Sequence, residues 1–144
     1  MITVALLAAA LLLAGGCGDE DGEQEATTGP VPSTSTADYD ITGSWSGKLS
    51  QQGLAGFRVE ATIGSLEDSS QNTVSYTGID CSGTWDYQGR EGAAFIFTET
   101  IDAGAGSDCK GTGTVSLTPF SPEGVDYVFR GGGVESDGAL RRQG

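Results

Sequence analysis

The residues of this chain that could carry chemistry are three cysteines and a set of acids, because histidine is absent. Without histidine, neither a Ser-His-Asp nor a Cys-His arrangement can form. Glu99 and Asp102 are candidates for the two-carboxylate chemistry of glycoside hydrolysis, but nothing in their spacing singles them out. The glycine-rich stretches 111–113 and 131–133 lack the strand-to-helix context of a phosphate-binding loop. We therefore expect no enzymatic activity and no cofactor.

The composition of the chain argues against two further functions, nucleic-acid binding and metal binding. The formal net charge is -13, from 7 Lys and Arg against 20 Asp and Glu. Nucleic-acid binding depends on clustered Lys and Arg, so we expect no nucleic-acid partner. A zinc site needs four ligands, which the cysteines cannot supply without histidine, so we expect no metal. The 144 residues suffice for one domain, and 24 glycines favour turn-rich β structure.

Cys17 stands at the border between an apolar run, residues 2–14, and an acidic stretch. The run is too short for a membrane-spanning helix. Gly15-Gly16-Cys17 resembles the lipobox of bacterial lipoproteins, which implies cleavage before Cys17 and acylation of its thiol. We expect a lipoprotein signal peptide at 1–16 and anchoring to the outer face of the cell membrane through lipid on Cys17. An uncleaved signal anchor or a buried amphipathic helix is the alternative.

Residues 17–40 are predicted to form an acidic, disordered tether. They contain no basic residue and include the low-complexity stretch TTGPVPSTSTA. Such a segment cannot bury enough apolar surface to offset the entropy of ordering. The stretch DEDGEQE lacks the ligand spacing of a calcium-binding EF-hand loop. The acids should hold the folded part away from an anionic lipid surface.

Cys81 and Cys109 are the pair that remains if Cys17 carries lipid. Thiols outside the cytoplasm are oxidised, so we predict a disulfide between Cys81 and Cys109.

The segment 41–144 alternates apolar and polar residues with a period of two, which is typical of strands with one buried face. Turn signals separate eight candidate strands at spacings that suit a meander of hairpins. The sequence therefore predicts one small, all-β, antiparallel domain, either an eight-stranded barrel or a barrel-like sandwich. We favour the barrel because closure removes exposed strand edges. The predicted inward-facing apolar residues are Trp45, Leu49, Phe57, Val59, Ala61, Ile63, Val74, Tyr76, Cys81, Trp85, Tyr87, Phe95, Phe97, Ile101, Val115, Leu117, Val125, Tyr127, Phe129 and Leu140.

Two resemblances bear on this domain. Gly43-Ser44-Trp45 on the first strand, with Arg142 on the last, is similar to the Gly-x-Trp and terminal Arg pairing of the lipocalin and avidin superfamily, the calycins. The segment 41–142 is similar to a small extracytoplasmic domain found in actinobacterial lipoproteins and in sensor regions associated with Ser/Thr protein kinases. The similarity lies in the order of the blocks TGSWSG, VSYTGIDCSGTW, FIFTETI, GTVSLT, VDYVF and GALRR. The second resemblance implies a binding or sensing role and no chemistry.

Glu99 is the one acid that the alternation places among apolar residues on an inward face. An unpaired buried carboxylate is costly, so it needs a partner. Arg142 shares the inward face of the last strand, and we predict that it pairs with Glu99. A bulge that turns Glu99 outward is the alternative.

The function predicted from the sequence is binding or sensing by a membrane-anchored barrel, with a small molecule or a cell-wall fragment as ligand. The alternative is an envelope module that interacts with another protein or has a structural role. A ligand-binding barrel should have an open, partly polar interior, whereas an interaction module should have a filled interior and an exposed apolar patch.

Overall fold

The computed structural model describes residues 38–104, 109 and 111–144. The chain divides into two units, 1–33 and 34–144, and every described residue belongs to the second. The predicted signal peptide, Cys17 and nearly all of the predicted tether therefore lie outside the described residues. Within the described part, no helix has the length and apolarity needed to cross a bilayer.

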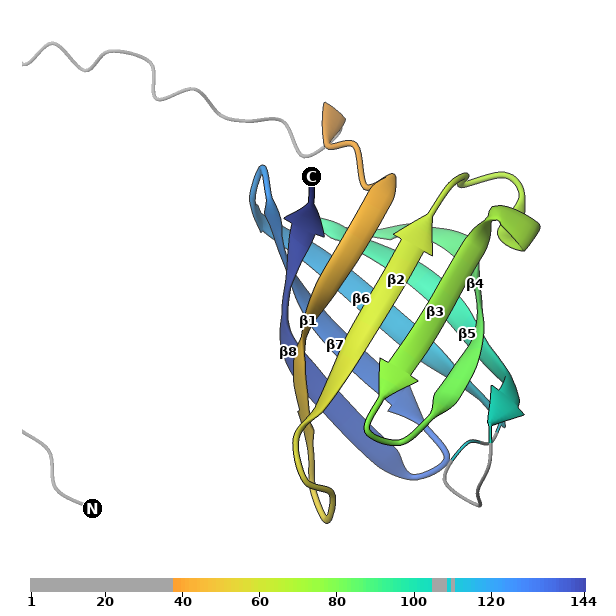
Figure 1. Cartoon of the computed structure of the whole chain (residues 1–144). Coiled ribbons are helices and arrows are strands. Elements are labelled where there is room, and N and C mark those ends of the chain that lie inside the picture. Colours follow the sequence, from red (N-terminus) through yellow and green to blue (C-terminus); the bar gives the residue numbers. More distant parts are fainter. Residues whose placement is uncertain (1–37, 105–108, 110) are drawn as a thin grey trace, which may run out of the picture. The chain divides into compact units, whose positions relative to one another are not determined.

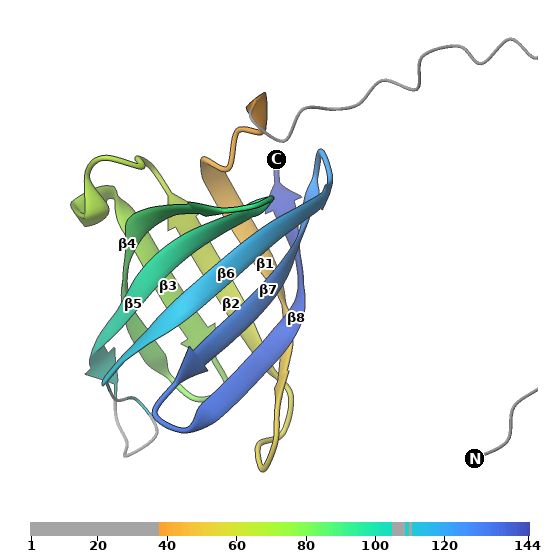
Figure 2. The same cartoon turned by 180° about the vertical axis from the view of Figure 1, so that it is seen from behind.

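The described residues form an antiparallel barrel of eight strands (Figures 1 and 2). Each strand pairs with the next one along the chain, and β8 pairs with β1 to close the sheet. The prediction of an all-β barrel is confirmed. The strands are β1 (Gly43–Gln51), β2 (Phe57–Ile63), β3 (Asn72–Thr77), β4 (Cys81–Glu91), β5 (Ala94–Gly104), β6 (Gly111–Ser121), β7 (Gly124–Gly131) and β8 (Val134–Gln143), with a short 3-10 helix η2 (Ser69–Gln71) before β3.

Closure of the barrel depends on close approach of β1 and β8. In their register Leu49 lies opposite Gly138 and Gly47 lies opposite Leu140. A Cβ atom on Gly138 would lie 2.3 Å from the backbone oxygen of Lys48. Because only glycine avoids this clash, the seam between the first and last strands is built around residues without a side chain.

Apolar residues from all eight described strands line the interior and form the core. Phe57, Val59, Ala61 and Ile63 on β2 are buried, while the residues between them are exposed. This is the pattern expected of a sheet with one face in a core. The buried apolar residues are Ile41, Trp45, Leu49, Phe57, Val59, Ala61, Ile63, Val74, Tyr76, Cys81, Trp85, Phe95, Phe97, Val115, Leu117, Val125, Tyr127 and Leu140.

One end of the barrel is covered by the segment that leads into β1, and we call it the covered end. The Tyr39 ring packs against Phe95 with centroids 6.1 Å apart, and its hydroxyl donates to the backbone oxygen of Pro122. Ile41 is fully buried. Tyr39, at the end of the segment predicted as tether, thus already contacts the barrel.

Arg142, near the end of β8, holds the segment before β1 at the covered end. Its guanidinium lies 4.4 Å from the centroid of the Trp45 ring and donates to the backbone oxygens of Asp40 and Thr42. A Cβ atom on Gly43, where φ is +125°, would lie 2.7 Å from Arg142 Nη1. Glycine at position 43 leaves the space that the guanidinium occupies, so Gly43 and Trp45 of β1 both contact Arg142 of β8.

Replacing Arg142 by alanine should lower the free energy of unfolding by about 2 kcal/mol, because the charged hydrogen bonds and the contact with Trp45 are lost together. Arg141→Ala is the matched control. Arg141 also lies over an aromatic ring, that of Phe120, but its side chain is exposed. Its effect should stay within about 0.5 kcal/mol. Urea denaturation of both variants checks this, and equal effects would show that Arg142 does not fasten the covered end.

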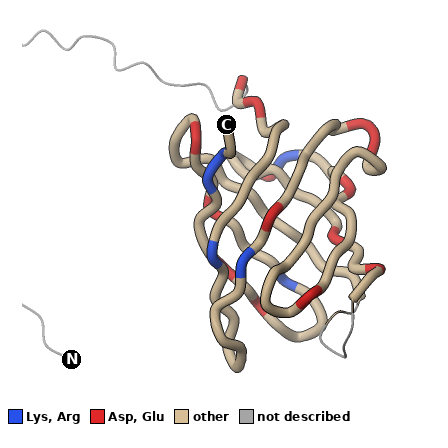
Figure 3. Tube along the Cα trace, in the orientation of Figure 1, with Lys and Arg blue, Asp and Glu red and all other residues tan. Residues whose placement is uncertain are grey.

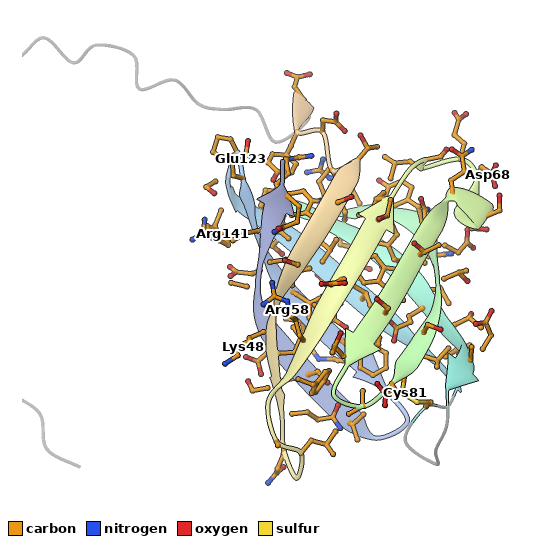
Figure 4. All side chains as sticks on the ribbon, viewed as in Figure 1. Lys48, Arg58, Asp68, Cys81, Glu123 and Arg141 are labelled. Carbon is orange, nitrogen blue, oxygen red and sulfur yellow. A yellow bond between two sulfur atoms is a disulfide. The ribbon has the colours of Figure 1, made fainter. Side chains whose placement is uncertain are left out.

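The predicted disulfide joins Cys81 to Cys109, with Cα atoms 5.1 Å apart. Cys81 begins β4, and Cys109 lies between β5 and β6. The bridge is therefore at the end of the barrel opposite the covered end. Figure 4 shows Cys81 at this end, and Glu123 and Asp68 at the covered end.

Charged residues lie mainly on the outside of the barrel. In the view of Figure 3, acidic and basic segments are interspersed along the strands and loops, with no continuous basic face. The ion pairs among the described residues are on the surface, as between Arg130 and Glu135.

Candidate functional site

A cavity of about 490 Å³ enters the barrel at the end opposite the covered end. Its mouth lies among the β1–β2, β3–β4 and β7–β8 connections, which Figure 1 shows at one end of the barrel. Half-buried apolar side chains, among them Leu54, Ile79, Ile101 and Phe129, line the wall. An apolar wall of this kind suits the body of a small organic molecule.

Glu99 lies at the base of this cavity, with only 3% of its surface exposed. It projects inward from the middle of β5 and lies directly opposite Trp85 of β4 in the register of the two strands. Trp85 Nε1 donates to Glu99 Oε2 over 2.8 Å, and the hydroxyl of Tyr76 from β3 donates to the same oxygen. The carboxyl group is therefore buried and hydrogen-bonded, as predicted for an inward-facing acid.

Two tyrosines extend the hydrogen bonding. The hydroxyl oxygens of Tyr76 and Tyr127 are 3.0 Å apart. Since each hydroxyl has one hydrogen and Tyr76 gives its own to Glu99, Tyr127 donates to Tyr76. Burial raises the pKa of both hydroxyls, so both remain protonated. The result is a chain of donors that ends on Glu99 Oε2.

The second carboxyl oxygen of Glu99, Oε1, is left open. None of the described residues donates a hydrogen bond to it. Within the described part of the chain, Ser121 Oγ is the one fully buried side-chain oxygen or nitrogen that lacks a partner, so Glu99 Oε1 retains contact with open space. Because Glu99 lines the cavity, this oxygen is available to a molecule that enters it.

The predicted pair of Glu99 with Arg142 is wrong. Arg142 lies at the covered end, beside Trp45 and the backbone of Asp40 and Thr42, and its side chain also approaches Glu123 at 3.5 Å. Both residues face inward as predicted, but they belong to different levels along the barrel axis. Alternation predicts the face of a residue and not its height in the barrel.

The partners of Glu99 were not identified from the sequence, although a signal for them was present. Tyr76, Trp85 and Tyr127 were all predicted to face inward, and each carries a polar atom that needs a partner when buried. An interior acid together with interior Tyr and Trp side chains predicts a shared network. Assigning it requires the strand register, which brings β3, β4, β5 and β7 together around one point.

Glu99 and Asp102 do not form an acid pair. Asp102 belongs to the outer face of β5, where it lines a second hollow of about 570 Å³ together with small polar residues of β1 to β4. Within the described residues, Glu99 is the one acid that lines the interior cavity. The same residues contain no group of three or more potential metal ligands.

Burial raises the pKa of Glu99 above its ordinary value of 4.5, and the bonds from Trp85 and Tyr76 oppose this rise. The folded state therefore holds the proton more tightly than the unfolded state does. Protonated Glu99 therefore stabilises the folded state below pH 4.5, and this stabilisation is lost as the pH rises through the folded-state pKa of Glu99.

Stability as a function of pH tests this assignment through Glu99→Gln, which keeps an acceptor oxygen but does not titrate. The unfolding free energy of the native protein minus that of the variant should fall between pH 4 and 8, by at most about 1.4 kcal/mol per pH unit. Urea denaturation across this range measures it. A difference that stays constant or rises would contradict a raised pKa.

Comparison with known proteins adds nothing to this geometry, because no family model, no curated protein and no solved structure matches the chain. What the structure places at the site is a half-open aromatic and apolar cavity whose base is a hydrogen-bonded glutamate.

Proposed function

We propose that this protein binds a small molecule in the barrel cavity and presents it on the outer face of the cell membrane, anchored by lipid on Cys17. The observation that carries the binding proposal is the cavity itself, which is about 490 Å³ in volume, apolar along its wall and polar at its base. Cavities of this kind are characteristic of small-molecule sites.

The outer surface favours a ligand over a protein partner. Within the described residues, Phe120 and Val134 are the exposed large apolar side chains. Phe120 is near the end of β6 and Val134 begins β8, so they lie at opposite ends of the barrel and form no common patch. An interaction module would be expected to show a contiguous apolar patch.

The disulfide supports an extracytoplasmic location, because disulfides persist in oxidising compartments and are rare in the cytosol. The lipid anchor is supported by the resemblance of Gly15-Gly16-Cys17 to a lipobox. A sensing role, as the resemblance to actinobacterial lipoprotein and kinase-associated domains implies, would use the same cavity.

A thermal-shift screen of the full-length chain tests the binding proposal. The panel would contain envelope lipids, glycans and peptidoglycan fragments, together with small apolar amines, alcohols and acids. A ligand that binds the folded state alone raises the melting temperature, by an amount that grows with ligand concentration. Absence of any shift at millimolar concentration would favour the alternative of an envelope interaction or structural module.

Cys17→Ser tests the anchor. We expect the variant to lose incorporation of labelled palmitate and to leave the membrane fraction or remain unprocessed, because the acylated sulfur is absent. The double variant Cys81→Ser, Cys109→Ser is the control and should still incorporate palmitate. Unchanged membrane association of Cys17→Ser would refute the lipoprotein assignment.

A further inference from the structure

The charge distribution around the cavity limits what it can bind. Glu99 is the one ionisable carboxyl among the described lining residues, and no Lys or Arg is among them. Lys48 and Arg58, on neighbouring strands β1 and β2, are exposed on the outside of the barrel. An anionic ligand would therefore meet a buried acid with no cation to offset it, which is strongly unfavourable.

The hydrogen-bonding capacity of Glu99 points the same way. Oε2 already accepts from Tyr76 and Trp85, whereas Oε1 is open to the cavity. Where Glu99 is ionised, its carboxylate only accepts hydrogen bonds, so a group that binds Oε1 in that state must be a donor. A positively charged donor gives the strongest such bond, particularly where water is excluded.

Aromatic rings surround the same space. Phe57, Tyr76, Tyr127 and Phe129 line the cavity, and the rings of Phe57 and Tyr76 meet edge to face with centroids 5.9 Å apart. The face of an aromatic ring attracts a cation. Phe129 also packs against Gly113, where a Cβ atom would lie 2.1 Å from its ring, so glycine keeps the ring in this position.

We propose that the cavity is selective for small organic cations, with a ligand ammonium group bound to Glu99 Oε1 and an apolar body directed toward the mouth. This rests on the proposed function, and it specifies the ligand class. The ammonium would replace the missing donor on Oε1, and Leu54, Ile101 and Phe129 would contact the body. The acidity of the whole chain would also raise the local concentration of a cation.

Isothermal titration calorimetry with three probes of one shape tests this selectivity on the full-length chain. The probes are 2-phenylethylammonium, 2-phenylethanol and 3-phenylpropionate, which differ chiefly in the charge of the head group. We expect the ammonium to bind at least about tenfold more tightly than the alcohol, and the carboxylate to bind least.

Two glutamate variants separate the cavity from the surface. Glu99→Gln keeps an acceptor for Tyr76 and Trp85 but removes the charge, and it should reduce the preference for the ammonium to less than about twofold. Glu67→Gln removes the same charge from an exposed loop near the covered end and should keep the full preference. Loss of the preference in both variants would overturn the proposal, since it would reflect general surface charge.

The pH dependence gives a second readout. Ammonium affinity should fall toward low pH in the native protein, because protonation of Glu99 removes its charge, and it should stay constant in Glu99→Gln. The other titratable groups that face Glu99 are Tyr76 and Tyr127, whose raised pKa keeps them neutral across this range. Trp85 and Gly113, its neighbours on β4 and β6, do not titrate.

The outcomes distinguish this inference from the proposed function. Equal or tighter binding of the alcohol or the carboxylate would overturn cation selectivity and leave small-molecule binding in place. Binding of none of the three probes would also overturn it, and the thermal-shift screen would then decide the broader proposal: a neutral ligand found there would uphold binding, and no ligand at all would remove both.

Discussion

Removing the Cys81–Cys109 disulfide is expected to lower the free energy of unfolding by about 3 to 4 kcal/mol. The bridge closes a loop with a sequence separation of 28 residues, which contains the whole of β4 and β5. In the chain-entropy model, the bridge restricts the conformations of the unfolded chain, so removing the bridge stabilises the unfolded state. For a domain of this size the loss is a large fraction of the total stability.

Urea denaturation of the double variant Cys81→Ser, Cys109→Ser measures this loss. Cys17→Ser is the control, and its unfolding free energy should match that of the native protein. Reductant should destabilise the native protein and leave the double variant unchanged. A loss below about 1 kcal/mol would mean that the unfolded chain gains little freedom when the bridge is absent.

Replacing Trp85 by alanine is expected to cost about 3 to 5 kcal/mol. Trp85 is fully buried, and its ring contacts those of Phe97 and Tyr127 with centroids 5.6 and 6.2 Å apart. The substitution leaves a hole in the barrel and removes the donor from Glu99 Oε2. Packing and hydrogen bonding are lost at the same point, so the effect should be among the largest of any single change.

Trp85→Phe separates the two contributions. It keeps an aromatic ring and removes the indole N–H, so we expect a smaller loss of about 1 to 3 kcal/mol. Chemical denaturation of both variants, followed by circular dichroism, gives the comparison. Equal losses would assign the effect to the hydrogen bond to Glu99, and a negligible loss in Trp85→Ala would show that the interior does not depend on this ring.

The fold class could be predicted because its main signal is local. Buried and exposed residues alternate regularly in β2 and over parts of the other strands, because side chains of neighbouring residues point to opposite faces of a strand. The inward positions of Trp45, Trp85, Glu99 and Tyr127 follow from this alternation. The disulfide was also predictable, because Cys81 and Cys109 are the pair that remains when Cys17, the predicted lipid site, is set aside.

Closure of the barrel is not a local property. A sandwich and a barrel can contain the same strands with the same alternation, and they differ in whether the first strand pairs with the last. The pairing of Trp45 with Arg142 across β1 and β8 spans nearly the whole domain. It depends on the summed twist and stagger of all the strands, which no single segment encodes.

The partners of Glu99 depended on the same information. The sequence by itself determined that an acid faces inward and needs hydrogen bonds. Only the tertiary structure decided that Tyr76 and Trp85 provide these bonds. It also brought Tyr127 into contact with Tyr76, which is 51 residues away in the sequence. Arg142, by contrast, lies at a different height along the barrel axis. The physical reason is that a two-residue period specifies the face of the sheet, whereas height along the axis is set by the register between strands, which forms only when the sheet closes.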